Sequence, residues 1–87
     1  MIEFYEKFMT KAEVDGVKEL IDLTHNGYVV TFSSKILTAC AFGLRHQRNG
    51  RKLTFFIGKY HYQIKENGRV IKSVIYDEDG VIVLPKN

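Results

Sequence analysis

The residues best suited to chemistry lie between Arg45 and Lys52, a stretch that reads RHQRNGRK and carries four fixed positive charges and a histidine. Its Asn49-Gly50 pair is a strong signal for a two-residue hairpin turn, which would place Arg48 opposite Arg51. Like charges directly opposite each other destabilise a hairpin, so we expect an internal carboxylate or an external anion to neutralise them. Because guanidinium groups bind phosphate through paired hydrogen bonds, this turn predicts a phosphate-binding site.

Aromatic residues are interleaved with basic ones through the same part of the chain. Single-stranded nucleic acids are bound in this way, because cations follow the phosphate backbone while exposed rings stack on bases. We expect Phe42 and Phe55 in the core, and Phe56, Tyr60 and Tyr62 as the candidates for exposed rings. The predicted nucleic-acid-binding residues are Lys35, Arg45, His46, Arg48, Arg51, Lys52, Lys59, Tyr60, Tyr62, Lys65, Arg69 and Lys72.

Catalytic and metal-binding patterns are not found in the sequence. It has no glycine-rich phosphate loop and no metal-ligand spacing of histidine or cysteine, so we expect no catalytic residue, metal or cofactor. His46 and His61 could act as acid and base in RNA cleavage, which keeps a compact ribonuclease as a less favoured alternative. They are expected on different strands, with no reason to converge. The single cysteine, Cys40, is expected to be a buried apolar residue.

The charge is unevenly distributed along the chain, whose formal net charge is +3. Residues 1–27 carry three lysines and six acids, a charge of −3. Residues 28–75 carry nine bases and one acid, a charge of +8, and residues 76–87 carry −2. A segment with a charge of +8 in so small a protein attracts polyanions, whatever the remainder carries.

An amphipathic helix is predicted after Thr10, because Thr10 and Glu13 have the spacing of a capping box. Asn26-Gly27 supplies the stop, and Gly16 suggests close packing on a neighbouring element. The segment 2–9 suits either a helical turn or a short strand. The expected apolar stripe consists of Val14, Val17, Leu20, Ile21 and Thr24, with Asp15, Lys18, Glu19 and Asp22 outside it.

A meandering antiparallel sheet is predicted after Gly27, where the apolar period changes from 3.6 to 2. A two-residue turn at Asn49-Gly50 pairs Leu44 with Phe55, and a turn at Asn67-Gly68 pairs Ile64 with Ile71. The second register puts Tyr62, Ile64, Ile71 and Ile75 on one face, opposite Lys72 and Val74. The alternative for residues 35–48 is a second helix that ends at Asn49-Gly50.

The expected architecture is α+β in a single domain, residues 1–87, with an N-terminal helix packed on about four to six antiparallel strands. Residues 1–27 form the acidic helical segment, and residues 28–84 form the basic sheet. The single cysteine and the absence of a long apolar run indicate a cytoplasmic protein without a membrane partner. Residues 81–84 are apolar and would form an edge strand, which allows a homo-oligomer through sheet extension.

These observations favour a small, non-enzymatic nucleic-acid-binding protein. RNA is a more favoured partner than DNA, because exposed rings stack on the unpaired bases that RNA loops present. The alternative is an inhibitor or adaptor, of the kind that viruses and mobile elements encode, whose basic face binds an acidic protein surface.

Overall fold

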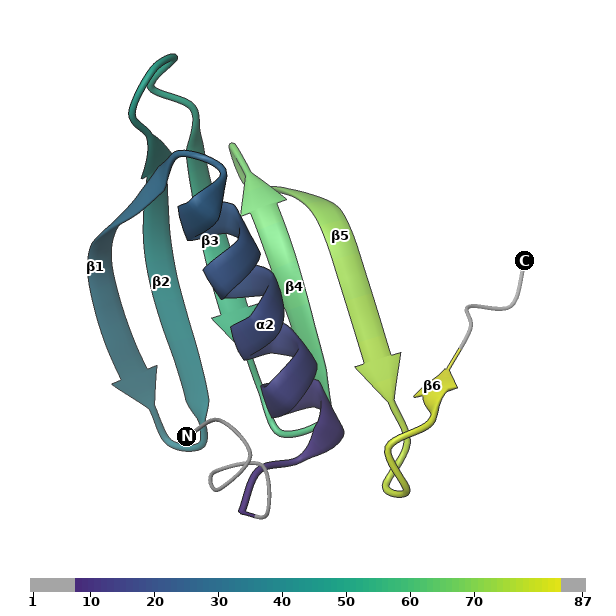
Figure 1. Ribbon diagram of the computed structural model, residues 1–87. Helices are drawn as coiled ribbons and strands as arrows, with labels where there is room; N and C mark the ends of the chain where they lie inside the picture. Colours follow the sequence, from purple (N-terminus) through teal and green to yellow (C-terminus); the bar gives the residue numbers. More distant parts are fainter. Residues whose placement is uncertain (1–7, 84–87) are drawn as a thin grey trace.

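The computed structural model describes residues 8–83 as a helix packed on a six-stranded antiparallel sheet (Figure 1). The strands follow one another across the sheet in chain order, and the expected α+β architecture is confirmed. Residues 1–7 and 84–87 lie outside the described part, and with them most of the segment 2–9 and the last residue of the expected edge strand 81–84. The elements are α2 (Lys11–His25), β1 (Tyr28–Ile36), β2 (Ala39–His46), β3 (Lys52–Ile57), β4 (His61–Glu66), β5 (Arg69–Tyr76) and β6 (Ile82–Val83).

The helix begins at the predicted capping box. The Thr10 hydroxyl accepts a hydrogen bond from the Glu13 backbone N–H at 3.2 Å, and the Thr10 N–H donates to the Glu13 carboxylate at 2.7 Å. The buried residues of the helix are Ala12 and Gly16, and the half-buried Val17, Leu20 and Leu23 lie beside them. The predicted apolar stripe included neither Ala12 nor Gly16, so that prediction is partly wrong. A Cβ at position 16 would lie 3.1 Å from Ile57 of β3, so the small residues bring the helix close to the sheet.

The predicted strand structure of residues 35–48 is confirmed and the alternative helix is wrong, since β1 and β2 are joined here through Leu37 and Thr38. The predicted register of β2 and β3 is wrong by two residues, because Leu44 faces Leu53 rather than Phe55. A hydrogen bond from the Gly50 N–H to the His46 carbonyl, at 2.9 Å, closes a wider turn than the predicted one. A shift of two residues returns each side chain to the same face. The apolar face that the sequence predicts is therefore preserved.

A β-bulge makes the second predicted register wrong beyond the Asn67-Gly68 turn. Ile64 pairs with Lys72 instead of Ile71, a shift of one residue that exchanges the two faces of β5. Lys72, Val74 and Tyr76 therefore face the helix, whereas Ile71 and Ile75 are exposed on the other side.

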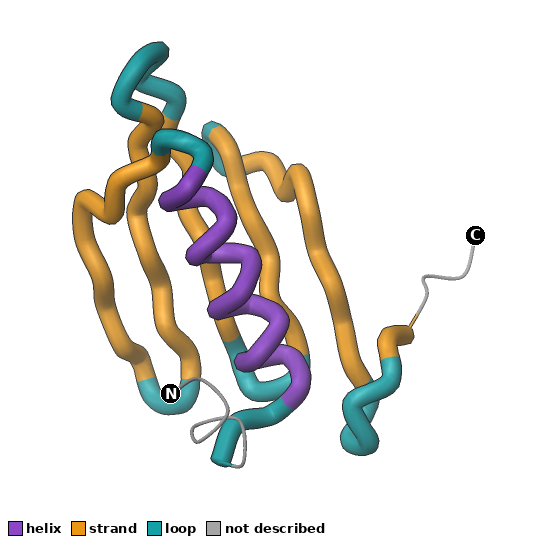
Figure 2. The backbone as a smooth tube through the Cα atoms, viewed as in Figure 1, coloured by secondary structure: helices purple, strands orange, loops and turns teal. Residues whose placement is uncertain are grey.

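The core lies between α2 and the face of the sheet that the helix crosses (Figure 2). Phe55 and Leu44 are its largest fully buried side chains, and the Phe55 and Tyr62 rings stack with centroids 5.8 Å apart. No helix within residues 8–83 is long and apolar enough to cross a membrane. The core also contains Ala12, Tyr28, Leu53, Ile57, Ile64 and Tyr76.

Candidate nucleic-acid interface

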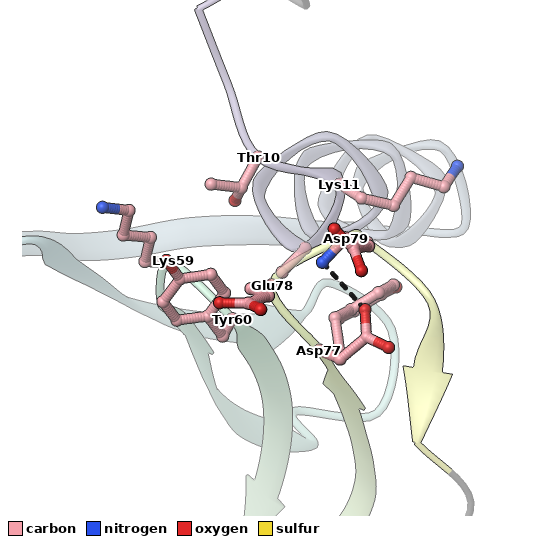
Figure 3. Close-up of a pocket in the computed structure, with 10 residues that line it drawn as sticks. Thr10, Lys11, Lys59, Tyr60, Asp77, Glu78 and Asp79 are labelled. Carbon is pink, nitrogen blue, oxygen red and sulfur yellow. Dashed lines mark hydrogen bonds between the residues drawn. The ribbon is translucent and has the colours of Figure 1, made fainter.

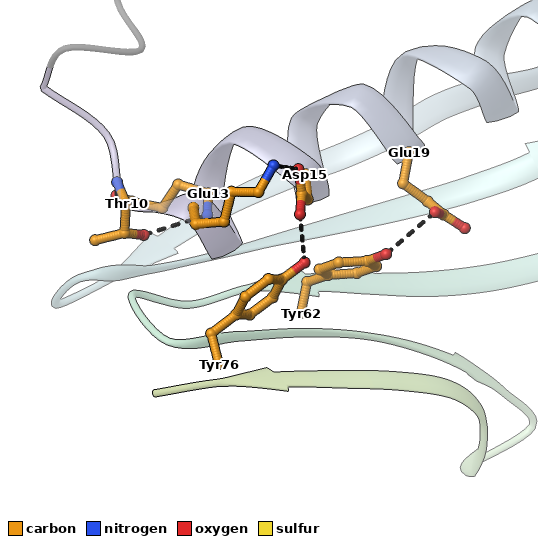
Figure 4. A network of polar contacts seen from close by, with 7 residues as sticks. Thr10, Glu13, Asp15, Glu19, Tyr62 and Tyr76 are labelled. Atoms are coloured by element: carbon orange, nitrogen blue, oxygen red, sulfur yellow. Dashed lines mark hydrogen bonds and ion pairs between the residues drawn. The ribbon is translucent and has the colours of Figure 1, made fainter. Parts of the chain in front are cut away.

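Two carboxylates of the helix accept hydrogen bonds from tyrosines of the sheet (Figure 4). The Tyr76 hydroxyl donates to Asp15 at 2.7 Å, and the Tyr62 hydroxyl donates to Glu19 at 3.3 Å. Burial, reinforced by these carboxylates, raises the pKa of both tyrosines. Burial alone would raise the pKa of Asp15, but the hydrogen bonds from Tyr76 and Lys11, together with the charges of Lys11 and Lys18, outweigh it and lower that pKa. These acids therefore fasten the helix to the sheet.

Two of the predicted phosphate-binding cations are neutralised within the chain. Lys72 Nζ lies 2.8 and 2.9 Å from the Glu19 carboxylate oxygens, and this hydrogen bonding raises the pKa of Lys72. Arg51 donates to both carboxylate oxygens of Glu66, at 2.7 and 3.0 Å, which lowers the pKa of Glu66. Of the two expected partners, an internal carboxylate or an external anion, Arg51 therefore has the internal one, which comes from β4.

Two further predicted site residues are held on the helix side. The Tyr62 side chain is only 5% exposed, so its predicted role as an exposed ring is wrong. His46 contacts the carbonyl of Asn26 through Nε2 at 3.0 Å, while its Nδ1 accepts from the Arg48 N–H at 3.1 Å. Its ring also meets Tyr28 edge-on, at a centroid distance of 4.9 Å. His46 thus ties the end of β2 to the end of α2.

The opposite surface of the sheet, which α2 does not cover, gathers cations, and none of the acids of residues 8–83 lies on it. We call it the open face. Cross-strand pairing places Arg45 beside Lys52 and Thr54 beside Lys65 on this face, and no carboxylate of the described chain lies within 4.0 Å of these three cations. The acids of residues 8–83 lie on α2, on the helix side of β4 at Glu66, or in the turn before β6. Within residues 8–83, the open face therefore carries positive charge that no carboxylate neutralises.

Two aromatic side chains share the open face with these cations. Phe56 is half-buried, and Lys65 Nζ lies 5.6 Å from the centroid of its ring. Phe32 is 53% exposed and pairs across the strands with Gly43. A cavity of about 380 Å³ beside Phe32 is lined by Thr31, Phe32, Gly43, Leu44, Arg45, Lys52, Leu53 and Thr54. Sequence reasoning found Arg45 and Lys52 but missed Phe32, since a bulge in β1 determines the face on which this ring lies.

The remaining predicted residues lie at the ends of the sheet. Arg48 and Arg69 are exposed at the β2–β3 and β4–β5 turns, and Lys35 is exposed near the end of β1. Lys59 Nζ lies 5.6 Å from the ring of Tyr60, which is 45% exposed. Both residues line a cavity of about 170 Å³ with the acidic turn 77–79 (Figure 3), an environment that repels phosphate. The twelve predicted residues thus do not form a single site.

The two histidines of the less favoured ribonuclease hypothesis do not meet. His46 ends β2 on the helix side, whereas His61 begins β4 on the open face, at the opposite end of the sheet (Figure 1). In the part of the chain that the structure describes, no group of three or more histidine, cysteine, aspartate or glutamate side chains could hold a metal ion. Cys40, expected to be buried, is half-buried on β2.

The chain matches no protein-family model. Neither a curated protein nor a solved structure shows significant similarity to it. The geometry of the open face therefore carries the functional argument.

Proposed function

We propose that the open face binds single-stranded nucleic acid, with RNA preferred over DNA, through phosphate contacts of Arg45, Lys52 and Lys65. One observation carries the proposal. These three cations lie together on a face without a described carboxylate, whereas Lys72 and Arg51 on the helix side are ion-paired. A polyanion carries negative charges along its whole length, so it can neutralise all three cations at once.

The cross-strand pair of Arg45 and Lys52 supports the same conclusion. Like charges directly opposite each other destabilise a sheet, and a bound phosphate relieves the repulsion. An acidic protein, the alternative partner, would also neutralise the cations but would give no role to the exposed rings. Bases stack on such rings, which favours nucleic acid.

The hydroxyl groups beside these cations favour RNA. Thr31 and Thr54 line the same cavity as Arg45 and Lys52, and hydroxyls can exchange hydrogen bonds with the ribose 2′-OH. We propose binding rather than catalysis, because His46 and His61 lie at opposite ends of the sheet. A cytoplasmic location is part of the proposal, since a single cysteine suits a reducing compartment.

Fluorescence anisotropy with a labelled single-stranded RNA tests this function. The triple variant Arg45→Gln/Lys52→Gln/Lys65→Gln is expected to bind roughly 10- to 100-fold more weakly at low salt, because three phosphate contacts are lost. The matched control, Lys11→Gln/Arg51→Gln/Lys72→Gln, removes the same charge from cations that are ion-paired within the chain. It is expected to lose much less affinity.

Equal losses in the two triple variants would contradict the assignment of the open face. Failure of the wild-type protein to bind single-stranded RNA, single-stranded DNA or duplexes would overturn the function as a whole. That result would favour the acidic protein partner.

A further inference from the structure

We infer that Phe32 is a stacking platform for one unpaired nucleobase, and that it makes the open face selective for single strands. This inference rests on the proposed function and adds to it a specific base-binding position. Three observations support it: a bulge that redirects Phe32, a glycine that makes room for its ring, and a cavity lined by two cations beside it.

The bulge in β1 places Phe32 on the open face. Residues two apart in a regular strand share a face, so Phe32 would lie on the same side as Val30. The register shifts between Val30 and Phe32, so that Val30 pairs with the buried Leu44 while Phe32 pairs with Gly43. Bulges redirect side chains in this way, and they interrupt the hydrogen-bonded ladder.

Gly43 makes room for the redirected ring. A Cβ at this position would collide with two ring carbons of Phe32 and would lie 2.8 Å from the Thr31 hydroxyl oxygen. Glycine within a strand often marks a place where another group approaches the backbone closely, and here that group is the Phe32 ring. The ring lies against the backbone at Gly43, and Phe32 as a residue remains 53% exposed. The bulge and the glycine thus both support one exposed aromatic surface.

The adjoining cavity has the size and lining for one nucleotide. Its volume of about 380 Å³ lies within the range of roughly 300–1,000 Å³ for small-ligand sites. A base stacked on Phe32 would have its phosphate near Arg45 and Lys52, which line the same cavity. Bases inside a duplex stack on one another and leave no free face for the ring. Stacking on Phe32 therefore adds to the affinity for single strands and does not add to the affinity for duplexes.

The test measures binding of Phe32→Leu to three probes of equal length: single-stranded RNA, an abasic sugar–phosphate oligomer and duplex RNA. Removal of one aromatic stack is expected to weaken the single-stranded RNA complex roughly 5- to 100-fold. Affinity for the abasic and duplex probes is expected to remain unchanged, because the cations are intact.

A second variant gives a direct optical signal. The chain contains no tryptophan, so Phe32→Trp introduces a single tryptophan fluorophore at the proposed platform. Its fluorescence is expected to be quenched by single-stranded RNA but not by the abasic oligomer. This readout remains valid if Phe32→Leu fails to fold.

The outcomes separate this inference from the proposed function. The assignment of Phe32 as a stacking platform is overturned if Phe32→Leu binds all three probes with wild-type affinity. It is also overturned if the substitution lowers the affinity for all three probes equally. The function still stands in that case, provided that the Arg45, Lys52 and Lys65 variant loses affinity. Unchanged tryptophan fluorescence of Phe32→Trp on saturation with single-stranded RNA would also overturn the platform.

Discussion

The two faces of the sheet use positive charge differently. On the helix side, Lys72 and Arg51 each contact a carboxylate at less than 3 Å. On the open face, Arg45, Lys52 and Lys65 contact none from the described chain. The formal net charge of +3 conceals this division. Strand alternation assigns each cation to a face, and the helix supplies acids to one face alone.

The helix can supply its acids because it packs closely on the sheet. Ala12 and Gly16 are buried against the strands, so the helix approaches near enough for Asp15 and Glu19 to reach the buried tyrosines. A larger residue at position 16 would meet Ile57. Small residues in the helix thus determine which acids become part of the structure.

The largest expected contrast is between two neighbouring residues of β3. Phe55 is fully buried on the helix side, so Phe55→Ala should lower the free energy of unfolding by about 3–5 kcal/mol. Phe56→Ala, on the open face, should reduce stability much less and weaken RNA binding. Urea denaturation and anisotropy of both variants check this. Equal destabilisation by the two substitutions would break the distinction between the faces.

A smaller effect is expected at the hydrogen bond between Tyr76 and Asp15. Tyr76→Phe should destabilise the fold by about 1–2 kcal/mol at pH 7, because a charge-assisted hydrogen bond is lost. The pKa of Asp15 is lowered from its ordinary value of 3.8, so its contribution is complete above that value and disappears as the pH falls through the lowered pKa.

The difference in unfolding free energy between wild type and Tyr76→Phe should therefore shrink below pH 3.8. Urea denaturation at pH 7 and at several lower values measures it. A difference that stays constant with pH would show that the Asp15 carboxylate does not contribute through this bond.

The smallest expected effect is that of Glu19→Gln, which removes the carboxylate beside Lys72. Because the ion pair is partly exposed, the variant should lose no more than about 1 kcal/mol of stability. Its RNA affinity should change less than twofold, since the released charge lies on the helix side. Thermal denaturation and anisotropy measure the two quantities, and a large gain in affinity would place the RNA on the helix side.

The sequence predicted the architecture because its strongest local signals act within a few residues. The capping box at Thr10 and the apolar alternation around Leu44 and Phe55 are confirmed. The two-residue error in the register of β2 and β3 left the predicted faces of these strands unchanged, since side chains on a strand alternate with a period of two residues. A one-residue bulge near Ile71 reversed the predicted faces of β5.

The candidate site was harder to predict because it depends on which face each residue occupies. Charge counting identified Arg45 and Arg51 alike, but only the pairing of β3 with β4 brings Glu66 to Arg51. Phe32 was missed because its position depends on a bulge between Val30 and Phe32 that no local motif marks.

The salt dependence of RNA affinity tests the central claim most directly. Arg45→Gln and Lys72→Gln each remove one positive charge, the first from the open face and the second from the helix side. Each phosphate contact contributes about 0.7 to the slope of log affinity against log salt concentration for a single strand. We predict that Arg45→Gln reduces that slope by about 0.7 and that Lys72→Gln leaves it unchanged. Equal reductions, or a larger one for Lys72→Gln, would contradict the assignment of the open face as the binding surface.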